Sequence, residues 1–263
     1  MHNKSIIEMT DALSKTYHLS NKSKKISIKK LIYKIEKKRV VKYEMRLIKI
    51  YKKCVLVSEA DRKYLDNLVN KNYLNVFTNG VKCLPNILNN YDSNKIIFVG
   101  NMRTLQNQDA VYFFIRDILP LVKKKAPKIV FHIIGAEPTK NIQEMADGKN
   151  VIVSGYVDSV EDEIKNAAIA VAPVRIAAGI QNKVLISMAC GVPVILTSLI
   201  SEGIPELVSN FNCIVADKKD DFANAVIELI ENKEKRNEIA KEGYKMVLSD
   251  YSWEKKLNGY EDE

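Results

Sequence analysis

The sequence predicts an α/β protein built around a parallel sheet, and three observations support this class. From residue 95 onward, short apolar runs of strand length alternate with segments of helical spacing. Several of these runs end in glycine, at the point where a buried strand would turn into a loop. The chain has 263 residues, which is enough for one large domain or two small ones. Strands that are separated by helices pair in parallel and carry helices on both faces.

The front of the chain has fewer strand signals. A long basic helix is expected over about residues 27–53, and short strands are expected at residues 54–58 and 73–81. An Asn-Gly pair at residues 79–80 predicts a turn in the second of these segments. These strands are too few for a doubly wound domain, so residues 1–93 are expected to form either an accessory layer or a partial N-terminal domain.

The rest of the chain carries the elements of a complete domain, residues 94–250, followed by a tail, residues 251–263. Apolar runs predict six strands, at residues 95–100, 128–135, 151–157, 169–174, 192–197 and 213–217. Helical spacing predicts the segments between and after them, at residues 109–127, 140–148, 159–167, from about 179 to 191, and 219–249, the last as one or two helices.

The composition is that of a soluble globular protein, with 46% hydrophobic and 28% charged residues. No apolar run reaches the roughly 18 residues that indicate a transmembrane helix, and the first residues do not resemble a signal peptide. The four cysteines are far apart, without metal-site spacing and at too low a density for a disulfide framework. A reduced, cytoplasmic setting is expected.

The net charge of +9 comes from one segment. Residues 21–53 contain 14 Lys and Arg and two Glu, a net of +12, so the remainder has a net of −3. Peripheral contact of residues 22–53 with an anionic membrane is one interpretation, because apolar residues 28, 31, 32 and 35 lie among lysines. The other, slightly favoured, is a helix that docks on the N-terminal sheet and leaves its basic face in water. Nucleic-acid binding is not expected, because the chain has no zinc spacing, recognition motif or stacking array.

Parallel sheets of this kind bind ligands outside the carboxyl ends of their strands. The run "APVRIAAGIQNKVLISMACG", residues 172–191, leads from such a strand end into a helix. The helix N-terminus, the permissive Gly179 and the cations Arg175 and Lys183 together suit a diphosphate. An ordinary strand–helix junction with solvated basic side chains remains an alternative.

Other polar residues give weaker signals. His132 lies in an apolar strand and is expected in the core, and Asp158 is as well suited to capping the next helix as to a site. No Ser-His-Asp set and no metal cluster stands out in the sequence.

The chain resembles the group-one retaining glycosyltransferases of GT-B architecture. The resemblance covers nearly all of the chain and rests on the order of its motifs rather than on any one of them. In the second half the matching runs are "IIFVGNM" (96–102), "DAVYFF" (109–114), "ILPLV" (118–122), "FHIIGAEP" (131–138), residues 151–198, "EGI" (202–204) and "YSW" (251–253). In the front they are "DALS" (11–14), residues 42–65 and "TNGV" (78–81).

The resemblance implies two Rossmann-like domains around a cleft, with a complete C-terminal domain that binds a nucleotide-diphosphate sugar and a partial N-terminal domain that holds the acceptor. It implies transfer of the sugar to a glycan or lipid-linked acceptor in surface polysaccharide or lipopolysaccharide synthesis, at the cytoplasmic side of the membrane and without a cofactor or metal. The catalytic residues would be Arg175 and Lys183, which stabilise the leaving diphosphate. The donor-binding residues would be Gly100, Asn101, Gly155, Tyr156, Val157, Gly179, Ile180, Gln181 and Asn182.

The sequence departs from the family pattern in two ways. Ile186 stands where the family has a glutamate that binds the ribose, and Ala178 stands where many members have a second glutamate. The early βα units and glycine-rich loop of the N-terminal domain have no counterpart, which predicts an N-terminally truncated chain. An inactive remnant, or a split subunit with a binding or scaffolding role, is therefore the alternative to an active enzyme.

Overall fold

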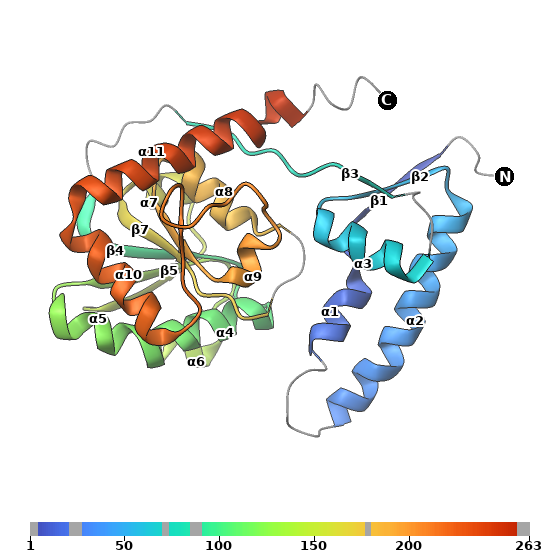
Figure 1. Cartoon of the computed structure of the whole chain (residues 1–263). Helices are drawn as coiled ribbons and strands as arrows, with labels where there is room; N and C mark the ends of the chain where they lie inside the picture. The colour runs from blue at the N-terminus through green and yellow to red at the C-terminus, as the bar shows by residue number, and fades with distance from the viewer. Residues whose placement is uncertain (1–4, 21–27, 70–73, 85–90, 177–179, 257–263) are drawn as a thin grey trace. The chain divides into compact units, whose positions relative to one another are not determined.

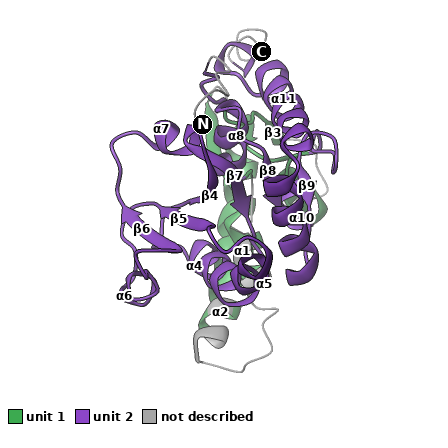
Figure 2. Ribbon diagram, turned by 90° about the vertical axis from the view of Figure 1, so that its left-hand side faces the viewer, with its two compact units in different colours: residues 1–79, 176–180, 202–204 green, residues 80–175, 181–201, 205–263 purple. Residues whose placement is uncertain are grey.

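The computed structural model describes residues 5–20, 28–69, 74–84, 91–176 and 180–256 (Figure 1). Grouped by contacts, the chain forms two compact units (Figure 2). Unit 1 comprises residues 1–79, 176–180 and 202–204, and unit 2 comprises residues 80–175, 181–201 and 205–263. Each unit has its own parallel sheet.

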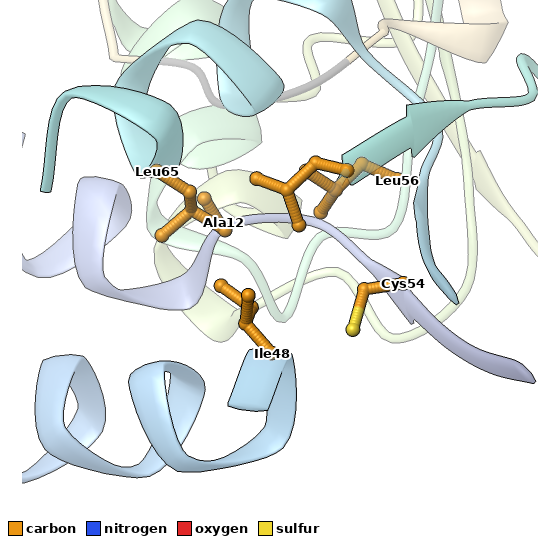
Figure 3. Close-up of a cluster of buried hydrophobic side chains, with 6 residues drawn as sticks. Ala12, Ile48, Cys54, Leu56 and Leu65 are labelled. Carbon is orange, nitrogen blue, oxygen red and sulfur yellow. The ribbon is translucent and has the colours of Figure 1, made fainter. Parts of the chain in front are cut away.

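Unit 1 contains a three-stranded parallel sheet in the order β1-β2-β3. Its strands are β1 (Ile6–Thr10), β2 (Lys53–Leu56) and β3 (Leu74–Val76), and its helices are α1 (Leu13–Ser20), α2 (Ile28–Ile50) and α3 (Glu59–Val69). The predicted basic helix is thus present as α2. The helices pack on the sheet around a small apolar core (Figure 3), whose buried members are Ala12, Ile48, Cys54, Leu56, Leu65 and Leu74.

Unit 2 contains a six-stranded parallel sheet in the order β6-β5-β4-β7-β8-β9. The strands are β4 (Asp92–Val99), β5 (Val130–Ile134), β6 (Val151–Gly155), β7 (Ala167–Ala172), β8 (Val194–Leu196) and β9 (Ile214–Val215). This is the 3-2-1-4-5-6 order of the doubly wound Rossmann fold. All six strands lie within the apolar runs of the sequence or overlap them, so the predicted α/β class and parallel sheet are confirmed.

Helices cover both faces of this sheet (Figure 1). One layer contains α4 (Leu105–Phe113), α5 (Leu119–Lys125) and α10 (Lys219–Glu231), and the other contains α7 (Val160–Lys165), α8 (Asn182–Ala189) and α11 (Lys233–Asp250). The short helices α6 (Lys140–Gln143) and α9 (Ser198–Ser201) lie in connections. Because the sheet is sandwiched, Ile96, Ile97 and Phe98 are all fully buried although consecutive side chains point to opposite faces.

The single helix predicted over residues 109–127 is wrong in one respect. A turn of π-helix, Phe114–Ile118, separates α4 from α5. Pro120 follows it in the first turn of α5 and has no amide hydrogen to donate. Its ring would also collide with the carbonyl of Arg116 in a regular helix, so a wider turn before the proline is the expected accommodation.

None of the helices in the described ranges is long and apolar enough to cross a membrane.

Candidate functional site

The topological switch point of the unit 2 sheet lies between β4 and β7. The chain runs outward from β4 through β5 to β6, and then returns to β7 and continues through β8 to β9. The connections after β4 and β7 therefore diverge, and such a point is where open α/β sheets bind ligands. Several of the predicted site residues lie there: Gly100 and Asn101 follow β4, and Arg175, Gln181, Asn182 and Lys183 follow β7.

Gly100 is required where it lies because a buried amide occupies the space of a side chain. A Cβ atom on Gly100 would lie 2.6 Å from Nδ2 of Asn107, which is closer than real contacts allow. Asn107 is itself 4% exposed, and its Nδ2 donates to the carbonyl of Asn101 at 2.8 Å. Asn101 is exposed, and its Oδ1 accepts from the amide of Arg103 at 2.9 Å. The loop after β4 is thus held on α4 by Asn107 and also by Gln108, whose Nε2 donates to the carbonyl of Met102 at 2.7 Å.

Lys183 reaches the same amide from the other side of the switch point. Its Nζ donates to Oδ1 of Asn107 and lies 4.9 Å above the ring of Phe98. The ammonium therefore has a neutral acceptor and the face of an aromatic ring around it. Burial lowers the pKa of Lys183 to about 8, because desolvation disfavours the charged form. An anion that approached this ammonium would offset that cost.

Arg175 is held by α4 as well. Its Nε and Nη2 donate to the two carboxylate oxygens of Asp109 at 2.9 and 2.6 Å. The guanidinium also stacks on Phe113, 4.4 Å from the ring centroid. The hydrogen bonds to Asp109 raise the pKa of Arg175. One helix therefore holds both predicted cations, through side chains two residues apart.

The start of α8 presents further donors. Within the described residues, the side chain of the N-cap residue Gln181 accepts no hydrogen bond from the first turn. Asn182 is exposed at the first helical position, and Ile180 is a half-buried, non-helical residue. Gly179 lies outside the described residues. The amide groups at the start of α8 thus remain suited to an anionic ligand.

The remaining predicted residues lie at the edge strand of the sheet. Gly155 ends β6 with a left-handed φ of +68°, and its carbonyl accepts from the amide of Gly135 at 2.9 Å. Tyr156 is 78% exposed, and Val157 is half-buried. Strand β6 is three strand spacings from β7, about 14 Å, so this group and Arg175 would contact different parts of an extended ligand.

Two features of unit 2 differ from the sequence analysis. His132 is buried, as expected, but its Nε2 lies 2.6 Å from the hydroxyl of Ser154 and its Nδ1 lies 3.7 Å from Oε2 of Glu163. In the register of β5 and β6, His132 pairs with Ile152, and Ser154 lies two residues further along β6, at the shift between the pairs Ile133–Val153 and Ile134–Gly155. The proposed capping role of Asp158 is wrong, because Ser159 is the N-cap of α7.

Asn107 and Asp109 were not predicted as site residues. Both residues lie in the first turns of the helix that follows β4. Because that helix begins at the switch point, their position could have indicated that they belong to the site.

One groove in the part of the chain that the structure describes lies elsewhere. A groove of about 640 Å³ is lined by residues 210–211 and by the first part of α11, which includes Lys235 and Glu238. Residues 210–211 precede β9, so this groove is at the amino end of that strand, opposite the edge that carries Arg175. Its polar, open lining has none of the predicted site residues.

Comparison with known sequences identifies the family. The sequence profile described as "Glycosyl transferases group 1" matches residues 93–232, which is more than half of the chain. The chain belongs to the group 1 glycosyl transferases. No curated protein sequence matches it.

Solved structures of group 1 glycosyl transferases share the fold. A mutant of S. aureus TarM, in complex with fondaparinux, α-GlcNAc-glycerol and UDP, is 19% identical with a TM-score of 0.74, over 85% of this chain and 46% of that one. HepE of Anabaena, in complex with UDP-glucose, is 11% identical with a TM-score of 0.74, over 98% of this chain and 71% of that one. Sucrose-phosphate synthase of Thermosynechococcus elongatus is 14% identical with a TM-score of 0.69, over 85% and 60%. The chain therefore spans less than half the length of TarM. The similarity to these structures shows that the chain has a GT-B-like fold.

Only one of the two positions at which the sequence departs from the family pattern lies within the described residues. Ile186 is half-buried in the middle of α8, one turn beyond Lys183. Ala178 lies outside the described residues. The side chain of Ile186 has no polar atom with which to bind a ribose hydroxyl, so this position of α8 offers no hydrogen bond to a ribose.

Proposed function

We propose that unit 2 binds a nucleotide-diphosphate sugar at its switch point. The chain then takes part in transfer of the sugar to a glycan or lipid-linked acceptor, in surface polysaccharide or lipopolysaccharide synthesis. Residues 94–250 form the donor-binding domain in this proposal. Residues 1–93 form part of the acceptor side, and residues 251–263 form a tail.

The environment of Lys183 carries this proposal. A half-buried ammonium that bonds to a neutral amide lacks the compensation that a carboxylate would give. The start of α8 adds positive potential to the same edge, where Arg175 also lies, paired with Asp109. A diphosphate would satisfy these groups together, and the same groups would stabilise negative charge on the leaving diphosphate during transfer.

UDP is the nucleotide that we expect to bind. TarM is solved in complex with UDP and HepE in complex with UDP-glucose, and this chain has the same fold. Gly100, Asn101, Gly179, Ile180, Gln181 and Asn182 would contact the donor near its phosphates and sugar. Gly155, Tyr156 and Val157 would contact its base.

A binding or scaffolding chain without transfer activity is the second candidate. Ile186 favours it, because the site then lacks the carboxylate that the family uses to bind the ribose. The two candidates share UDP binding and differ in turnover.

Calorimetry with UDP tests the shared step. The wild type should bind UDP, and Lys183→Ala should bind at least tenfold more weakly, which corresponds to about 1.4 kcal/mol. Lys140→Ala is the matched control, because it removes an exposed lysine of unit 2 that pairs with Glu144. Equal losses in the two variants would reject the site. Sugar release from UDP-sugars, measured on the same samples, separates enzyme from binding chain.

Unit 1 offers a surface for an anionic membrane. Exposed side chains follow one another on α2 at helical spacing, at positions 32, 35, 39, 43, 46 and 50. Ile32, Ile35 and Tyr43 are 50%, 53% and 61% exposed and alternate with arginines along this stripe. The opposite side of α2 carries the buried Glu44 and Ile48.

The docked helix and the membrane-binding helix are therefore compatible interpretations, because α2 packs within unit 1 and still exposes apolar side chains among cations. Such a face suits the boundary between lipid headgroups and acyl chains. We propose peripheral contact of residues 22–53 with the inner face of the membrane, where a lipid-linked acceptor would lie.

A further inference from the structure

The two cations of the switch point have different partners. Lys183 bonds to the neutral amide of Asn107, whereas Arg175 forms a bidentate ion pair with Asp109. The charge of Arg175 is therefore already compensated in the free protein. Phe113 lies four residues after Asp109 on the same face of α4, and the guanidinium carbon of Arg175 stacks 4.4 Å from the centroid of its ring.

The carboxylate of Asp109 binds Arg175 through the same kind of contact that a phosphate group would make. Carboxylate and phosphate both offer two oxygens that match the planar fork of a guanidinium. Asp109 is half-buried, and Arg175 is 46% exposed at its side chain. A phosphate from the solvent could therefore reach the exposed side of the guanidinium, while the ring of Phe113 held the guanidinium in place.

We propose that Asp109 is an internal competitor for the donor diphosphate: it holds Arg175 while the site is empty and releases it when the diphosphate binds. This inference rests on the proposed donor binding at unit 2. It assigns to Asp109 a positioning role and an effect on affinity. The carboxylate keeps Arg175 at the switch point, and it also lowers the affinity for UDP, because the exchange of one anionic partner for another gains less than the pairing of a free cation.

The exchange predicts that removal of a negative charge strengthens binding. Asp109→Asn keeps the shape of the side chain and gives up the ion pair. A partly exposed pair is worth up to about 1 kcal/mol, so the affinity for UDP should rise by about two- to fivefold. In the Arg175→Ala background the same substitution should give no gain, because the competed cation is gone.

Asp117→Asn is the matched control. Asp117 is an exposed residue of the π-helix that acts on Arg175 through space, so this variant changes the net charge equally without removing the hydrogen bonds. Calorimetry with UDP on the wild type, the two aspartate variants, Arg175→Ala and the Asp109→Asn/Arg175→Ala double variant completes the set. Far-ultraviolet circular dichroism and thermal unfolding check that each variant is folded.

The outcomes separate the inference from the proposed function. A gain in Asp109→Asn that exceeds the gain in Asp117→Asn and disappears without Arg175 supports the exchange. UDP binding that depends on Lys183 but does not strengthen in Asp109→Asn overturns the exchange and leaves the donor site standing. An equal gain with and without Arg175 also overturns it, because the effect is then one of net charge. If neither the wild type nor any variant binds UDP, the donor site and the exchange both fall.

Discussion

Raising the pH from 7 to 9 is expected to weaken UDP binding about tenfold through Lys183 alone. Burial lowers the pKa of this lysine to about 8 in the free protein. About nine in ten molecules then carry the ammonium at pH 7, and about one in ten at pH 9. UDP binds the protonated form, and its charge raises the pKa of Lys183 in the complex towards the ordinary lysine value. Affinity is therefore full below pH 8 and falls as the pH rises through 8.

Calorimetry between pH 7 and 9.5 measures this effect at constant ionic strength. The diphosphate of UDP is largely ionised over this range, and the remaining titration of the nucleotide, such as loss of the uracil N3 proton at the upper end, affects the control variant equally. Lys183→Arg is the control, because a guanidinium stays protonated and its binding should change little with pH. A flat affinity for the wild type, or the same decline in Lys183→Arg, would refute the reasoning that an uncompensated ammonium of Lys183 binds the diphosphate.

Three further predictions concern other parts of the chain. Ile186→Glu should raise UDP affinity about tenfold if the restored hydrogen bonds are worth about 1.4 kcal/mol, and calorimetry should show that 2′,3′-dideoxy-UDP gains nothing. Gly100→Ala should lower the free energy of unfolding by about 1–3 kcal/mol and weaken UDP binding, because the new Cβ displaces the amide of Asn107 that holds Lys183. A denaturant titration and calorimetry measure the two effects, and an unchanged stability together with an unchanged UDP affinity would contradict this prediction. The protein should co-sediment with anionic vesicles and be released by salt, since screening acts over about 8 Å at physiological ionic strength; Ile35→Glu should reduce this binding, and equal binding to neutral vesicles would reject the membrane surface.

The parallel sheet of unit 2 could be predicted from the sequence because its strands are buried on both faces. Residues 96–99 are apolar at every position, residues 130–134 are apolar apart from His132, and a glycine follows each run where backbone segments approach closely. A Cβ on Gly135, for example, would lie 1.7 Å from the carbonyl oxygen of Gly100. The prediction failed at residues 114–118, where a π-helix replaces the regular helix, although Pro120 carried the signal.

The candidate site was predictable only in part. Topology alone placed Gly100, Arg175 and Lys183 at strand ends, because ligand sites of parallel sheets follow from strand direction. It did not show that Asn107 and Asp109 hold the two cations, since those contacts join residues 66 and 76 positions apart in the chain. The pKa of Lys183 likewise depends on burial, which no local sequence pattern specifies.

A crystal structure of the chain with UDP would show directly whether Lys183 binds the diphosphate. We expect a diphosphate oxygen about 3 Å from Nζ of Lys183, with the phosphates at the start of α8. We also expect the guanidinium of Arg175 to face a phosphate rather than Asp109. UDP bound elsewhere, for instance in the groove beside Lys235, with Lys183 still bonded only to Asn107, would refute the proposed donor site.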